Sequence, residues 1–161
     1  MVTDITSAIE AIQAILAPAV MITGVALLLL SLNARHSSVV NRIRLLDDEK
    51  RQLNKKLKSS GKLGKTESLR FASVKNQVSL LLPRLAYLRN GILCHMLAVL
   101  FFVLTSLSIG LSYFSASTAI VETAVNVTFM GGMVLVLVGV AFLAVEIFIS
   151  YQVILVEVRE E

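Results

Sequence analysis

Residues 12–32 read IQAILAPAVMITGVALLLLSL, an apolar run that contains no charged side chain. A hydrocarbon core about 30 Å thick is crossed by about 20 apolar residues in a helix. The run therefore predicts a first transmembrane helix over residues 12–33. Residues 91–113 and 124–150 are equally apolar, and Glu146 is the one acidic or basic residue in them. They predict a second and a third transmembrane helix, because an open sheet would leave unsatisfied backbone groups in lipid.

Charge in the chain is scarce and unevenly placed. The sequence has 161 residues, of which 56% are apolar and 16% charged, and its mean hydropathy is +0.80. Fourteen of the fifteen basic residues and four of the eleven acids lie between Arg35 and Arg89, which gives that segment a net charge of +10. Basic loops beside membrane spans stay in the cytoplasm. We therefore expect residues 34–90 to be cytoplasmic, with the N-terminus outside and the C-terminus inside.

This orientation assigns the remaining segments. Residues 1–11 form an outer segment, residues 114–123 an outer link, and residues 151–161 a cytoplasmic extension. Neither outer segment contains Lys or Arg, as the positive-inside rule requires. We do not expect specific nucleic-acid binding, because the basic residues are placed where membrane topology alone requires them.

The basic segment itself shows helical periodicity. Apolar residues lie at spacings of four, three, seven and four before the turn sequence Ser59-Ser60-Gly61-Lys62-Leu63-Gly64, and at alternating spacings of three and four after it. This heptad-like pattern predicts two helices that pack against each other. The expected fold class is an all-α integral membrane protein with three transmembrane helices and a cytoplasmic helical hairpin between the first and second. The stripes are Val39, Ile43, Leu46, Leu53 and Leu57 before the turn, and Phe71, Val74, Val78, Leu81, Leu85, Leu88 and Ile92 after it.

Glu146 is the polar residue that most needs an explanation. A carboxylate within a span is costly and is usually paired. Three candidate partners lie at a similar depth, namely Arg89, His95 and Arg35. One interpretation is a proton or cation relay, and the simpler one is a clamp between helices.

The first helix also fits an ion pathway. Glu10 and Gln13 lie at its outer end, Thr23 midway, and Arg35 and Arg42 at the inner exit. Repeated around a symmetry axis, Glu10 would form an acidic ring of the kind that attracts cations. Three spans are few to enclose a pathway, so we expect the protein to be a homo-oligomer. The same placement of acids and bases also follows from topology alone.

Catalytic motifs are not found in the sequence. It lacks a phosphate-binding Walker loop, a dinucleotide glycine fingerprint, an HExxH motif and a nucleophile elbow. Its two histidines and single cysteine do not have metal-site spacing. We therefore expect a protein that is not an enzyme and has neither cofactor nor metal. The expected partners are membrane lipids, with anionic headgroups at the basic hairpin.

Several short sequences resemble one bacterial family. They are Ala17-Pro18-Ala19-Val20, Leu32-Asn33-Ala34-Arg35, Arg42-Ile43-Arg44-Leu45-Leu46, Arg84-Leu85-Ala86-Tyr87-Leu88-Arg89 and Phe142-Leu143-Ala144-Val145-Glu146-Ile147. Together they resemble the three-span membrane family catalogued as the domain of unknown function numbered 2721, over roughly residues 12–157. The resemblance implies a protein of the bacterial inner membrane and supplies no activity.

Three functions remain open from the sequence. The first is a homo-oligomeric channel lined by the first helix. The second is a non-conducting membrane scaffold whose basic hairpin binds partners or anionic lipids. The third is an insertase-like chaperone, since the order of spans is similar to the core of the Oxa1-type insertases, although fold-level analogy is weak evidence of function.

Overall fold

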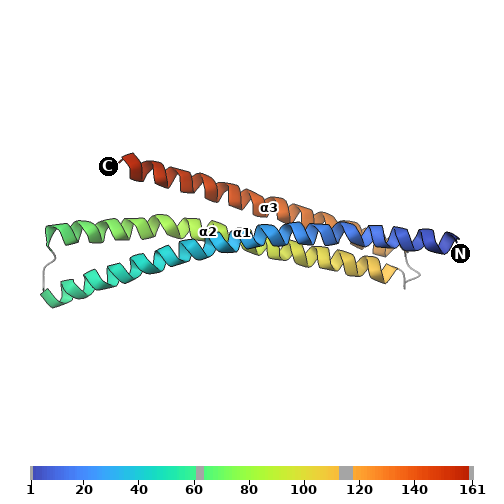
Figure 1. The fold of residues 1–161 in the computed structure, drawn as a ribbon, viewed down its shortest axis with the longest axis horizontal. Helices are drawn as coiled ribbons and strands as arrows, with labels where there is room; N and C mark the ends of the chain where they lie inside the picture. Colours follow the sequence, from blue (N-terminus) through green and yellow to red (C-terminus); the bar gives the residue numbers. More distant parts are fainter. Residues whose placement is uncertain (1, 61–63, 113–117, 160–161) are drawn as a thin grey trace. The chain divides into compact units, whose positions relative to one another are not determined.

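The chain folds into three long helices. The computed structural model describes residues 2–60, 64–112 and 118–159, with side-chain surroundings for residues 12–56, 64, 66–112 and 120–151. Helix α1 is Val2–Ser60, α2 is Lys65–Ser112 and α3 is Thr118–Arg159 (Figure 1). Helices α1 and α2 continue through Pro18 and Pro83. Each helix is far longer than the roughly 20 residues that cross a bilayer.

All three helices are long and apolar enough to span a membrane. The apolar stretches lie within Ile12–Lys56, Thr66–Ser112 and Ile120–Tyr151. Their exposed side chains are largely leucine, isoleucine, valine, methionine and phenylalanine, as expected of surfaces that face lipid. The prediction of an all-helical chain with three helices able to cross a membrane is therefore confirmed. The side on which the charged segment lies stays a prediction.

The chain divides into two compact units. The first unit comprises residues 1–32 and 90–141, and the second comprises residues 33–89 and 142–161. The first two divisions lie close to the expected inner ends of the first and second spans, and the third falls within the expected third span. The first unit thus contains most of the apolar sequence, whereas the second contains the basic segment.

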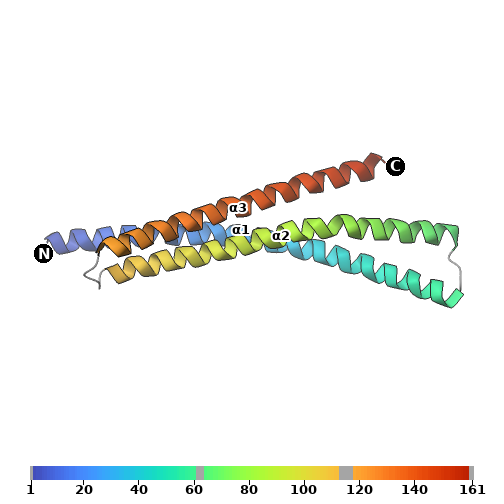
Figure 2. The ribbon, with the colours of Figure 1, turned by 180° about the vertical axis from the view of Figure 1, so that it is seen from behind.

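An apolar core holds the first unit together. Val25 of α1 and Ala98 and Phe102 of α2 are fully buried there. The Phe102 ring also contacts Phe129 of α3, with ring centroids 5.7 Å apart. Glycines on α3 allow this close packing, because a Cβ at Gly132 would lie 2.8 Å from the Phe102 ring. Figure 2 shows α2 and α3 side by side in this unit.

The second unit is built on a seven-residue repeat. Its buried positions are Val39, Leu46 and Leu53 on α1, and Val74, Leu81 and Leu88 on α2. A strict spacing of seven is the signature of coiled-coil packing. Residues 33–60 of α1 and 65–89 of α2 lie side by side in both views (Figures 1 and 2). We call these two segments the basic helix pair.

Ion pairs join the two helices of the basic helix pair along the edge of its apolar seam. Arg70 Nε donates to Glu49 Oε1 at 2.7 Å, and Lys56 Nζ donates to Glu67 Oε1 at 3.2 Å. Exposed pairs of this kind contribute little stability individually. Each pair joins a residue of α1 to a residue of α2, 21 and 11 positions apart in the chain, and so helps to align the two helices along their length.

Candidate functional site

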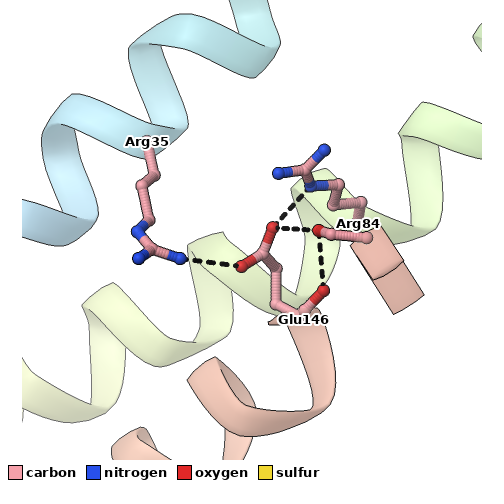
Figure 3. Close-up of polar contacts among 4 residues, drawn as sticks. Arg35, Arg84 and Glu146 are labelled. Atoms are coloured by element: carbon pink, nitrogen blue, oxygen red, sulfur yellow. Dashed lines mark hydrogen bonds and ion pairs between the residues drawn. The ribbon is translucent and has the colours of Figure 1, made fainter. Parts of the chain in front are cut away.

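The most unusual side chain in the second unit is Glu146 of α3, which is completely buried. Arg84 of α2 donates from Nε to Glu146 Oε1 at 2.5 Å. Arg35 of α1 places Nη1 3.6 Å from Glu146 Oε2. Figure 3 shows the carboxylate between the two guanidinium groups. One acid therefore connects all three helices, and we call these three residues the arginine–glutamate cluster.

The two arginines are held differently. Arg84 makes a short charge-assisted hydrogen bond, whereas Arg35 makes a longer ion pair. Among the described residues Glu146 Oε2 has no hydrogen-bond partner. The hydroxyl of Ser150, one turn further along α3, donates to the backbone oxygen and to Oε1 of Glu146, each at 2.9 Å. The carboxylate is thus fixed mainly through Oε1.

The seven-residue phase of α3 explains why Glu146 is buried. Between Ile120 and Tyr151, the buried positions are Gly132, Gly139 and Glu146. The carboxylate therefore occupies the next position of a packing face that begins with small residues. One helical turn earlier, the Phe142 ring contacts Tyr87 of α2 with centroids 6.3 Å apart, which holds α3 against the basic helix pair.

Burial of the acid is not matched by burial of the bases. The Glu146 side chain has no exposed area, whereas 28% of the Arg84 and 46% of the Arg35 side chain is exposed. An isolated buried carboxylate would be strongly unfavourable, and two nearby cations compensate for it. The three formal charges sum to +1, and the excess positive charge faces outward. Chemically the cluster is an electrostatic clamp with an open cationic side.

Sequence reasoning found part of this cluster. Of the three partners predicted for Glu146, Arg35 lies beside it, whereas Arg89 is exposed. His95 belongs to the first unit and Glu146 to the second. Arg84 and Ser150 were missed. The signal that would have found Arg84 is the helical phase, since it lies one turn before Leu88 on the half-buried side of α2.

His95 has the surroundings of a packing residue. It is completely buried on α2, and its Nδ1 lies 2.8 Å from the Gly91 backbone oxygen. Its ring packs on Gly139 of α3, at a distance too short for any Cβ on that residue. Nε2 has no partner among the described residues. The ring is held by packing and by one local hydrogen bond.

The residues expected along an ion pathway are not gathered at one site. The side chain of Glu10 lies outside the described residues. Gln13, Thr23 and Arg42 are exposed, and the Thr23 hydroxyl donates to Ala19 O of the same helix at 3.1 Å. Arg35 is engaged with Glu146. The pathway stays a prediction.

The chain matches the model of a known protein family over most of its length. The model of the family described as Protein of unknown function (DUF2721) matches residues 15–156. No curated protein and no solved structure matches the chain.

Proposed function

The chain belongs to this family of proteins of unknown function, so its role has to be argued from its own residues, and we propose that it is a non-conducting membrane scaffold. In this proposal the spans anchor the basic helix pair upright on the cytoplasmic face of a bacterial inner membrane. Arginines at the base of the pair bind anionic phospholipids. The arginine–glutamate cluster is the observation that carries the proposal, because it ties the pair to α3.

Stiffness of the basic helix pair supports a scaffold. Its seam repeats every seven residues, ion pairs join its helices, and the buried carboxylate fixes α3 against both. Breaking a buried ion pair by removing one partner is strongly unfavourable. The base of the pair is therefore its most constrained part, which suits an element that has to project at a fixed angle.

The sequence around the arginines at the base of the basic helix pair contains no acidic residue. Arg35, Arg42, Arg44, Arg84 and Arg89 occupy this region, and no acid lies in residues 33–46 or 68–90. We call these five residues the arginine collar. The distal part of the pair instead mixes lysines with its four acids. Arginine is the side chain best suited to phosphate, because its planar fork binds two oxygens at once.

Packing of the first span favours this role over a channel. Its exposed surface carries the large apolar residues Ile12, Leu16, Val20, Leu27 and Leu30, and the polar side chains Gln13 and Thr23 interrupt it at only two points before residue 31. A water-filled pathway requires polar groups along its wall. An insertase-like groove would also require free polar groups exposed at membrane depth. The described His95 and Thr105 are buried, and the exposed Thr23 hydroxyl donates to Ala19 O of its own helix.

Lipid composition around the purified protein tests the proposal. The protein is reconstituted in nanodiscs of phosphatidylcholine and phosphatidylglycerol, and the enrichment of phosphatidylglycerol near it is measured. The triple variant Arg42→Gln, Arg44→Gln, Arg89→Gln should lose most of the enrichment, since each basic residue near an anionic surface contributes about 1 kcal/mol. Equal enrichment in this variant and the wild type would contradict the proposal.

A matched control removes the same charge further from the membrane. The triple variant Lys50→Gln, Lys55→Gln, Lys75→Gln also loses three positive charges, and its enrichment should remain near that of the wild type. Ion flux into liposomes that contain the wild-type protein should equal flux into empty liposomes. Flux that depends on Gln13 or Thr23 would instead establish the channel.

A further inference from the structure

The arginine–glutamate cluster leaves hydrogen-bond donors unused. Each guanidinium has five N–H groups, and Glu146 engages Nε of Arg84 and Nη1 of Arg35. Both arginines retain exposed area while the carboxylate has none. We propose that Arg35 and Arg84 together hold the phosphate of one anionic phospholipid through the N–H groups that Glu146 does not engage. This inference rests on the proposed scaffold function and names a defined site within it.

The expected depth of Arg35 and Arg84 in the membrane suits contact with the phosphate of a lipid. Arg35 lies three residues after Leu32, where the first apolar run ends, which is about 4.5 Å along a helix. Arg84 lies seven residues before Gly91, or about 10 Å, and its side chain reaches back to Glu146. The headgroup layer on each side of the hydrocarbon core is about 5–7 Å thick. The two guanidinium groups therefore lie at the level of the phosphates.

Glu146 prepares the site instead of occupying it. Its two oxygens face different arginines, so it holds two flexible side chains apart at fixed positions. Rigid presentation of binding groups increases affinity, because less conformational freedom is lost on binding. The carboxylate neutralises one positive charge, and the second remains for a phosphate.

Exposed apolar side chains at the same helical level as the cluster, on other faces of α2 and α3, favour a lipid over a soluble phosphate. Ile147 and Phe148 follow Glu146 directly on α3, and 46% and 72% of their surfaces are exposed. Leu82, two residues before Arg84, is 53% exposed. These side chains offer contacts to acyl chains, which a free phosphate ion does not have. The site is therefore assigned to a headgroup and not to inorganic phosphate.

Binding of phosphatidylglycerol to the full-length protein in phosphatidylcholine nanodiscs tests the site. The variant Arg84→Lys keeps the charge and loses the planar fork. It should bind phosphatidylglycerol about tenfold more weakly, which corresponds to loss of one charge-assisted hydrogen bond. The control Lys75→Gln loses a full charge from an exposed residue outside the arginine collar, far from the membrane, and should stay within about twofold of the wild type. An Arg84→Lys affinity equal to that of the wild type would overturn the site.

Glu146→Gln separates a binding site from a purely structural clamp. Glutamine keeps a side-chain oxygen that can accept from Arg84 Nε and so keeps the arginine in place, but it removes the negative charge that opposes the phosphate. Phosphatidylglycerol binding should therefore be unchanged or tighter. A clamp that only maintains the fold would make Arg84→Lys and Glu146→Gln weaken binding alike, and that result would overturn the inference. Circular dichroism and the unfolding temperature of each variant verify that it is folded.

Two comparisons distinguish this inference from the scaffold proposal. If the wild type prefers phosphatidylglycerol, and Arg84→Lys binds it as tightly as the wild type while the collar variant that loses three charges binds it more weakly, the collar binds by charge alone and the defined site is wrong. If the wild type shows no preference over phosphatidylcholine, the scaffold proposal itself is wrong. Inorganic phosphate at the same concentration should not displace the lipid, and displacement would reject the assignment to a headgroup.

Discussion

Substitution of Gly139 by alanine tests the packing of α2 against α3 in the first unit. A Cβ on Gly139 would overlap Cε1 and Nδ1 of the His95 ring, and would lie 3.3 Å from Cγ. Carbon atoms in favourable contact are about 3.5–4.0 Å apart. The ring or the helix must therefore move.

The cost can be estimated from what the ring would lose. Overpacking of a well-packed core costs about 1–3 kcal/mol. Movement of the ring would also stretch the 2.8 Å hydrogen bond between Nδ1 and Gly91 O, which contributes about 1 kcal/mol. We expect Gly139→Ala to lower the free energy of unfolding by about 2–4 kcal/mol.

Thermal unfolding in a mild detergent, followed by circular dichroism, measures this loss. Gly24→Ala is the matched control, because nothing lies within 4 Å of a Cβ at Gly24. Alanine is the better helix former by about 1 kcal/mol, so the control should be neutral or slightly stabilising. Equal unfolding temperatures for Gly139→Ala and Gly24→Ala would refute the close contact. Addition of His95→Ala to Gly139→Ala should recover part of the loss, since the overlapping ring is gone.

Other substitutions probe different contacts. Gly132→Ala should destabilise the protein by about 1–3 kcal/mol, because its Cβ would lie 2.8 Å from the completely buried Phe102 ring; an unchanged unfolding temperature would contradict this. Glu146→Leu should cost about 1–3 kcal/mol, less than for a fully buried pair because water reaches both arginines it leaves behind; a gain in stability in the same assay would show that the charges are not needed. A hydrogen bond from Arg70 holds the pKa of Glu49 below its ordinary value of 4.5. The Arg70–Glu49 ion pair therefore stabilises the fold above pH 4.5, and this stabilisation is lost as the pH falls through the lowered pKa of Glu49. The difference in unfolding free energy between the wild type and Arg70→Gln should shrink on acidification. A difference that stays constant with pH would argue against the ion pair.

Hydropathy and periodicity were sufficient to predict which segments of the chain are helical. The charge-free run before Leu32 and the heptad positions from Val39 to Leu88 predicted which segments are helical and which face of the basic segment is buried. Both signals are properties of local sequence, because side-chain direction repeats with a fixed period along a helix. They need no knowledge of the neighbouring helix.

The partners of Glu146 could not be predicted by depth alone. Arginine side chains are long, so Arg84 reaches the carboxylate from a position that residue counting placed beyond the membrane. Arg89 lies nearer to the expected depth, yet it is exposed. Which arginine faces α3 depends on the rotation of α2 about its axis, and that rotation is fixed by packing between helices.

Register is the property that links the buried polar residues to the fold. Within lipid, apolar side chains gain little by packing on each other rather than on acyl chains, so small and polar residues determine which helix faces meet. In the first unit, the Thr105 hydroxyl donates to the Thr128 hydroxyl at 2.9 Å across α2 and α3. In the second unit, the buried carboxylate of Glu146 has the same role with Arg84. A shift of α3 by one turn would separate both pairs and leave the carboxylate buried without a cation, a state more costly than the loss of any single apolar contact. The polar contacts therefore select one alignment of α3 from the many that its apolar surface would permit.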